Sequence, residues 1–272
     1  MSDIARAFDH GPAFIAFLTG GDPTIEQSRQ YALALIEGGA DLLEIGIPFS
    51  DPIAEGPVIQ AANVRSLTAG ATIEKIFGLA ASIHAETTAP IVFLTYLNPV
   101  FHYGYDAFMK RCAEAGVSGL IIPDLPYEEQ GEIIPAARAH GIDVITLVAP
   151  TSADRIARIA DDATGFVYLV SSLGVTGARS EITTDLGAIR EAIRARTDTP
   201  VAVGFGVHTP DQAGAIATQA DGAIVGSKIV SIIAEHPDDA AGYLRDYAAS
   251  MKQAMVSALA ETSPADAAGE QR

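Results

Sequence analysis

Short apolar runs alternate with amphipathic segments along the whole of this 272-residue chain, and this alternation limits the folds that it can adopt. Eight runs have the length and composition of strands: 14–18, 41–46, 91–96, 119–123, 143–149, 165–171, 201–204 and 222–225. Because a helix that connects two strands covers the sheet, the two strands that it connects are expected to run parallel. Eight such units can close on themselves, so the pattern predicts a (βα)8 TIM barrel of the α/β class.

The segments between these runs have helical periodicity. Helices are expected at 24–37, 58–69, 73–85, 106–115, 128–139, 153–160, 185–195, 211–218 and 229–255. An open doubly wound sheet is the competing architecture, and it predicts a glycine-rich turn after the first strand. The residues there, Thr19-Gly20-Gly21-Asp22-Pro23, contain no G-x-G-x-x-G motif, so the barrel is favoured.

A single domain accounts for the length, because one barrel of this type occupies about 250 residues. We expect the catalytic barrel to span residues 1–258. Past Leu259 the composition changes to Glu261-Thr262-Ser263-Pro264, which predicts a disordered acidic tail over residues 259–272.

The charge balance excludes some classes of partner. Lys and Arg number 17 against 34 Asp and Glu, and a net charge of −17 argues against nucleic acid and anionic membranes. No apolar signal region and no uninterrupted apolar run of about 18 residues occurs, so we expect a cytoplasmic protein. The single Cys112 is expected to be a buried thiol, and the scattered histidines predict no metal site.

The strand Leu42-Leu43-Glu44-Ile45-Gly46 carries a carboxylate on a face that looks internal. Alternation places Leu42, Glu44 and Gly46 on one face and Leu43 and Ile45 on the other. Both faces are apolar, and a carboxylate there is costly unless it is paired or put to use. Glu44 is therefore the first catalytic candidate, with a structural ion pair as the alternative.

Other polar residues also end expected strands, where the active site of a TIM barrel lies. They are Tyr96, Asp124 and, within its strand, Tyr168. Apolar neighbours raise the pKa of a carboxyl group and permit proton transfer near neutral pH, which makes Asp124 a second candidate. The tyrosines have core packing as their alternative role.

Three glycine-bearing loops follow the last three strands: Gly174-Val175-Thr176-Gly177, Gly204-Phe205-Gly206 and Gly226-Ser227. Glycine lets backbone N–H groups approach an anion closely, so these loops predict a phosphate site. Tight turns that need glycine are the alternative. The segment 171–180 has the composition of a lid, or else of a disordered connector.

Two stretches, residues 44–57 and 171–177, are similar to the tryptophan synthase alpha chain family, and the resemblance extends over residues 8–255. It implies a carbon–carbon lyase of tryptophan biosynthesis that cleaves indole-3-glycerol phosphate by a retro-aldol reaction to indole and glyceraldehyde 3-phosphate. No cofactor is implied in this chain. The implied partner is a beta subunit that contains pyridoxal phosphate and receives the indole, in an alpha2beta2 heterotetramer.

The resemblance also implies residue roles. Glu44 would protonate indole C3, with Tyr168 packed beside it. Glu55, where the family has aspartate, would hold the indole N–H and disperse developing positive charge. With Tyr96, which ends an expected strand, the substrate-binding residues would be Phe17, Leu94, Thr176, Gly177, Phe205, Gly206, Ile224, Gly226 and Ser227.

Loops 49–57 and 98–103 correspond to the family's partner contacts, and the second is unusually aromatic for an exposed connection. Burial within the loop itself is the alternative. Two other functions remain open. One is another phosphate-binding barrel isomerase or lyase that acts on a phosphorylated sugar-like substrate. The other is a non-catalytic activating subunit, which Glu44 argues against and Glu55 leaves open.

Overall fold

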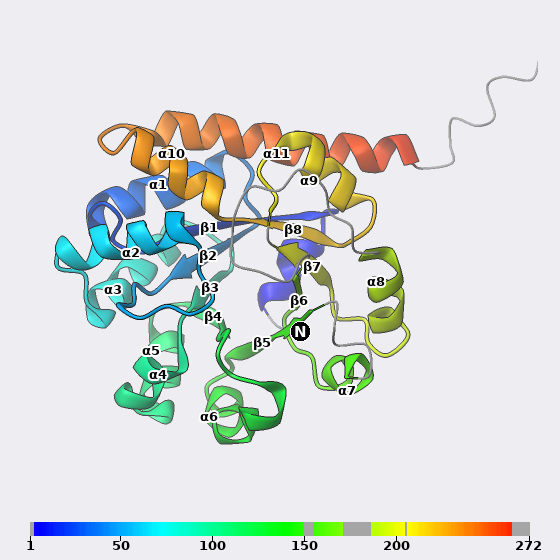
Figure 1. Ribbon diagram of the computed structural model, residues 1–272, viewed down its shortest axis with the longest axis horizontal. Helices are drawn as coiled ribbons and strands as arrows, with labels where there is room; N and C mark the ends of the chain where they lie inside the picture. The colour runs from blue at the N-terminus through cyan, green and yellow to red at the C-terminus, as the bar shows by residue number, and fades with distance from the viewer. Residues whose placement is uncertain (1–2, 150–154, 171–185, 205, 263–272) are drawn as a thin grey trace, which may run out of the picture.

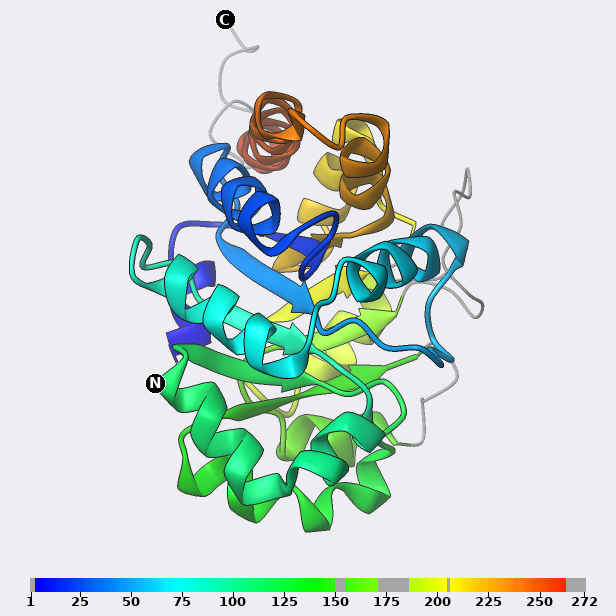
Figure 2. The same ribbon diagram turned by 90° about the vertical axis from the view of Figure 1, so that its left-hand side faces the viewer.

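The computed structural model describes residues 3–149, 155–170, 186–204 and 206–262. Its eight parallel strands form one closed barrel in which each strand pairs with the next and β8 pairs with β1 (Figures 1 and 2). The strands are β1 (Ala13–Thr19), β2 (Leu42–Gly46), β3 (Ile91–Leu94), β4 (Val117–Ile121), β5 (Asp143–Val148), β6 (Val167–Val170), β7 (Val201–Gly204) and β8 (Gly222–Val225). The predicted TIM barrel is confirmed, and every strand overlaps an expected run.

Helices surround the barrel, and Figure 1 shows α1, α9, α10 and α11 along one side of it. The α-helices are α1 (Ile25–Glu37), α2 (Pro57–Thr68), α3 (Ile73–His84), α4 (Leu97–Tyr103), α5 (Tyr105–Glu114), α6 (Ile134–Ala139), α7 (Ile156–Asp161), α8 (Leu186–Arg194), α9 (Pro210–Ala217), α10 (Ser227–Glu235) and α11 (Ala240–Thr262). The described residues also contain two 3₁₀ helices, η1 (Asp3–Phe8) and η2 (Tyr127–Glu132). None of the helices in the described ranges could cross a membrane.

Some helix boundaries differ from those expected. Residues 98–103, expected as a loop, lie within helix α4. The helix expected at 229–255 is two helices, because Pro237 has no N–H with which to continue α10. The one expected at 128–139 starts as η2, and Pro135 occupies the first turn of α6.

The last helix also ends later than expected. Helix α11 continues to Thr262, beyond the boundary placed at residue 258. Ala258, Leu259, Ala260 and Glu261 are good helix formers, which accounts for the extension. The rest of the expected tail, residues 263–272, lies outside the described residues.

The strands divide the apolar side chains into two layers. Leu43 and Ile45 of β2 belong to the outer core between barrel and helices, whereas Leu42 belongs to the core of the lumen. Buried residues of the lumen core are Ile4, Ala7, Ala13, Ile15, Leu42, Val92, Ile121, Ile145, Phe166, Tyr168, Ala202 and Ile224. The predicted alternation along β2 is confirmed, and it directs Glu44 into the lumen.

Helix η1 closes the amino end of the barrel. Ile4 and Ala7 are buried in the lumen core, and the ring of Phe8 lies 6.1 Å from that of Phe166, centroid to centroid. A lumen that is filled from this end leaves the carboxyl ends of the strands as the place for an active site.

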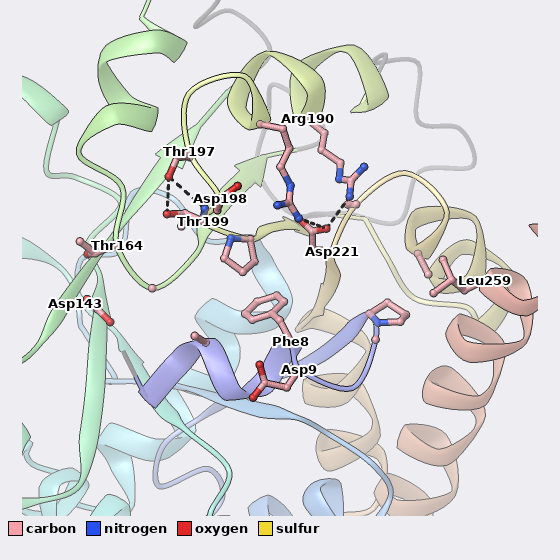
Figure 3. A pocket seen from close by; sticks show the side chains of 18 of the residues that line it. Phe8, Asp9, Asp143, Thr164, Arg190, Thr197, Asp198, Thr199, Asp221 and Leu259 are labelled. Atoms are coloured by element: carbon pink, nitrogen blue, oxygen red, sulfur yellow. Dashed lines mark hydrogen bonds and ion pairs between the residues drawn. The ribbon is translucent and has the colours of Figure 1, made fainter. Parts of the chain in front are cut away.

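A cleft of about 1060 Å³ lies beside η1, at the amino ends of β5 to β8 (Figure 3). At its wall, Oδ1 of Asp221 accepts hydrogen bonds from Arg190 and Arg194 of α8 at 2.8 and 2.9 Å, and Oδ2 accepts one from the Val201 N–H at 2.8 Å. Burial favours a higher pKa for Asp221, but these hydrogen bonds outweigh it and hold the pKa below the usual value. Asp221 therefore ties α8 to two strands.

Asp221→Ala should lower the free energy of unfolding by about 2 kcal/mol at neutral pH, because it leaves donors without their acceptor. A carboxylate whose pKa is depressed by folding contributes stability that is lost as the pH falls, so the two proteins should converge below about pH 4. Urea denaturation at several pH values measures this. Asp198→Ala, an exposed position in the same cleft, is the control. Equal effects of the two variants would contradict the role given to Asp221.

Candidate active site

Glu44 lies on β2 with its side chain in the lumen. Strand pairing places Phe17 and Val92 beside it in register. Glu44 is 1% exposed, and no partner among the described residues hydrogen-bonds its Oε2. Burial, and after it the charge of Glu55, raises the pKa of Glu44 from 4.5 to about 8. A carboxyl group in this state keeps its proton at neutral pH and is suited to donate it.

Glu55 is the second buried carboxylate, in the loop between β2 and α2, where it is 7% exposed. Asn63 of α2 donates a hydrogen bond from Nδ2 to Oε2 at 2.5 Å. Burial raises the pKa of Glu55, although Asn63 and the Tyr96 hydroxyl oppose that shift. Since its charge acts on Glu44, the two predicted catalytic glutamates lie at the same end of the barrel.

Tyr168 on β6 belongs to the lumen core and is 6% exposed. Burial, and after it the charge of Glu44, holds the pKa of the phenol well above its usual value. The hydroxyl therefore keeps its proton at every pH at which the enzyme is expected to work. Its electrostatic coupling to Glu44 agrees with the expected neighbourhood of these two residues.

Two aromatic rings of the site occupy space that glycines leave open. A Cβ added to Gly204 on β7 would lie 2.3 Å from the Tyr168 hydroxyl oxygen. A Cβ added to Gly46 at the end of β2 would lie 2.9 Å from the ring of Phe17. Both distances are too short for any side chain, so the ring positions depend on these glycines.

The expected indole-pocket residues lie in one continuous apolar region. Phe17 packs in a cluster with Ile59 of α2 and Val230 of α10. Leu94 packs against both this cluster and the lumen core, which includes Ile224. Ile59 and Val230 were not predicted from the sequence. The sequence indicates a role for them only through their position, because each lies on the helix that follows a loop expected to form the site.

Gly206, Gly226 and Ser227 follow the carboxyl ends of β7 and β8, as predicted. Helix α10 begins at Ser227, so the free N–H groups of its first turn are at this end of the barrel. Among the described residues, no atom lies within 4 Å of a Cβ placed on Gly206. The expected residues Thr176, Gly177 and Phe205 lie outside the described residues, and phosphate binding stays a prediction.

Tyr96 and Asp124 bond to the loops at the barrel mouth. The Tyr96 hydroxyl accepts a hydrogen bond from the Ala54 N–H at 3.1 Å, and burial, together with the Glu55 charge, raises the pKa of Tyr96 to about 12. Asp124 accepts a hydrogen bond from the Leu97 N–H at 2.9 Å, at the start of α4. Tyr96 is thus bonded to the loop between β2 and α2, which carries Glu55, and Asp124 is bonded to the first residue of α4.

The described ranges contain no group of three or more side chains that could hold a metal ion. Cys112 is buried, and burial raises the pKa of its thiol. A buried neutral thiol is a poor nucleophile.

The fold and the two buried carboxyl groups define a TIM-barrel enzyme with acid–base chemistry at the carboxyl ends of its strands. Residues 5–259 match the family model described as tryptophan synthase alpha chain. The tryptophan synthase alpha chain of Lactiplantibacillus plantarum is 51% identical over 263 residues, 96% of this chain and 99% of that one. The alpha chain of Lacticaseibacillus casei is 48% identical over 255 residues, 94% and 96% of the two chains.

Solved structures agree. Tryptophan synthase from Mycobacterium tuberculosis matches with a TM-score of 0.86 and 36% identity, over 93% of this chain and 98% of that chain. A chain of the tryptophan synthase α2β2 complex from Pyrococcus furiosus matches with a TM-score of 0.82 and 36% identity, over 89% and 98%. The chain belongs to the tryptophan synthase alpha chain family. It is a carbon–carbon lyase of tryptophan biosynthesis, as its resemblance predicted.

Glu44→Gln should stabilise the fold increasingly as the pH rises. Folding raises the pKa of Glu44 from 4.5 to about 8, so the native state binds the proton more tightly and the wild type loses stability across this window. The glutamine variant does not titrate there. The difference in Tm between variant and wild type should thus be small at pH 5 and clearly positive at pH 9. Exposed Glu235→Gln is the control, and a difference independent of pH would rule out the elevated pKa.

Proposed function

We propose that Glu44 and Glu55 carry out the retro-aldol cleavage of indole-3-glycerol phosphate to indole and glyceraldehyde 3-phosphate, the reaction of this family's lyase. The observation that carries the assignment is the difference between the two carboxyl groups. Glu44 has a pKa of about 8 and an oxygen without a hydrogen-bond partner among the described residues, whereas Glu55 accepts a hydrogen bond from the neutral amide of Asn63. Glu44 is suited to donate a proton, and Glu55 is suited to stabilise a nearby positive charge.

The reaction needs one proton given and one proton removed. Glu44 protonates C3 of the indole ring, which leaves positive charge on the ring nitrogen. Ionised Glu55 accepts the N–H hydrogen bond and stabilises that charge. The bond between C3 and the glycerol carbon then breaks as the adjacent hydroxyl loses its proton and becomes the aldehyde. The electron pair of the broken bond restores the indole ring. The Glu44 carboxylate, which has given up its own proton, can accept the proton that the hydroxyl releases.

We assign the rest of the substrate to the apolar and glycine-rich parts of the site. Phe17, Leu94 and Ile224 provide apolar surface for the indole ring. Gly206, Gly226 and Ser227, with the first turn of α10, provide backbone donors for the phosphate. Local donors of this kind let a chain with a net charge of −17 hold an anion. Thr176, Gly177 and Phe205 complete this assignment by resemblance.

The partner of this chain is a tryptophan synthase beta subunit, in an α2β2 assembly like that of the Pyrococcus furiosus complex. Two large apolar side chains support contact at the barrel mouth, since Ile53 is 72% exposed and Phe101 is 63% exposed. The alpha chain needs no cofactor in this proposal, and pyridoxal phosphate belongs to the beta subunit. We also place the protein in the cytoplasm, where a biosynthetic enzyme with one buried thiol is expected.

Glu44→Gln should abolish indole release from indole-3-glycerol phosphate, with or without a beta subunit. The amide keeps the shape of the side chain but cannot transfer a proton, and such groups contribute about 10² to 10⁴ in rate. The assay follows indole in a purified preparation whose Tm shows that the variant is folded. If more than about a tenth of the activity remained, Glu44 would not be the proton donor. Failure of the wild type to release indole under either condition would reject the lyase itself.

Phe101→Asp should weaken binding to the beta subunit and the stimulation that the subunit gives, because a charge would have to be buried in the interface. Basal indole release by the isolated chain should change by less than about twofold, since surface substitutions outside the site leave the fold intact. Titration of one subunit into the other measures the affinity. Tyr243→Asp, at an exposed aromatic residue on α11, is the matched control. Equal effects of the two variants would place the interface elsewhere.

A further inference from the structure

Asn63 is a buried polar residue that the proposed reaction does not use directly. It lies on α2, is 3% exposed, and donates from Nδ2 to Oε2 of Glu55 at 2.5 Å. A hydrogen bond to an ionised acceptor is stronger than one between neutral groups. An amide also stays neutral at every working pH. Asn63 can therefore hold an ionised Glu55 without adding a charge that would compete for the proton of Glu44.

The backbone around Glu55 has little freedom to move. The Ala54 N–H donates to the Tyr96 hydroxyl at 3.1 Å, and Gln60 Nε2 donates to the Glu55 carbonyl oxygen at 2.8 Å. Pro57 follows in the first turn of α2 and restricts the chain further. Main-chain groups are thus held on both sides of the carboxylate. The position of the carboxylate therefore depends on the side-chain torsions of Glu55 and on the group that holds the end of the side chain.

Helix α2 is itself anchored to the barrel close to Asn63. Nε and Nη2 of Arg65 bond to both carboxylate oxygens of Asp22, at 2.8 and 2.7 Å. The Ser66 hydroxyl donates to the Gly20 carbonyl oxygen at 2.7 Å. Asp22 and Gly20 belong to the loop after β1, so this part of α2 is fixed relative to the sheet. The Asn63 amide is consequently a rigid reference point for Glu55.

We propose that Asn63 is a positioning residue for the lyase reaction: its amide holds the Glu55 side chain where the carboxylate can accept the indole N–H. This inference rests on the role proposed for Glu55. It goes beyond that role because it names the residue that sets the position of the carboxylate. Asn63 acts through Glu55 and does not itself touch the substrate.

Asn63→Ala and Asn63→Asp test the inference. Both should lower kcat by about tenfold or more, which corresponds to the loss of one hydrogen bond to a charged group, with a smaller effect on KM. Glu55 must be ionised to act, and losing a donor raises the pKa of a carboxylate, so the acid limb of the kcat/KM profile should move to higher pH. Asn63→Asp keeps the shape of the side chain and replaces the neutral amide with a second carboxyl group beside Glu55, so repulsion between the two groups should raise the pKa of Glu55 further than Asn63→Ala does.

Tyr31→Phe is the matched control, because it removes the hydrogen bond of a buried residue on α1, from its hydroxyl to the Pro237 carbonyl oxygen, without changing α2 or Glu55. It should lower Tm and leave the pH profile unchanged. A second control combines Asn63→Ala with Glu55→Gln, and the added loss should be less than about twofold if Asn63 acts only through Glu55.

Either of two results would overturn the inference: a wild-type pH profile and kcat in Asn63→Ala, or the same kinetic loss in Tyr31→Phe as in Asn63→Ala. Indole release by the wild type distinguishes these results from a failure of the lyase function. If the wild type is active and the Asn63 variants behave as it does, only the role of Asn63 is wrong.

Discussion

The desolvation of Glu44 is the constraint on which the site depends. A carboxyl group can remain neutral near pH 7 only if water is kept away from it, and here a closed barrel, apolar neighbours and a plug at the amino end exclude water. Glu55, whose charge acts on Glu44, accepts a hydrogen bond from the Asn63 amide instead. The same end of one barrel therefore contains a carboxyl group that keeps its proton, Glu44, and a carboxylate that can accept a hydrogen bond, Glu55. Cleavage of a carbon–carbon bond next to an indole ring requires this combination.

Much of this arrangement could be predicted from the sequence, because it depends on local periodicity. The alternation along β2 is enough to place Glu44 in the lumen, and the eightfold repetition is enough to indicate the barrel. Contacts formed between elements could not be predicted in this way. Asn63, Ile59 and Val230 have unremarkable helical surroundings in the sequence, and only packing of α2 and α10 across the mouth brings them to the site. Helix α4 was missed because seven residues with a central proline resemble a loop.

The region around Glu55 combines a fixed main chain with a side chain that is held at its end. Hydrogen bonds hold the main-chain groups on each side of it, and α2 is bound to the loop after β1 by a partly buried ion pair. The Asn63 amide then sets the position of the carboxylate end.

The paired glycines and rings of the lumen have a consequence for how this enzyme could change. Gly46 and Gly204 give no group to the chemistry, yet the rings of Phe17 and Tyr168 occupy the volume that side chains at these positions would need. A larger residue at either position would collide with the pocket wall before it reached any ligand. Evolution toward another substrate would therefore have to replace glycine and ring together, and the pocket is protected against stepwise redesign by two residues that have no side chain.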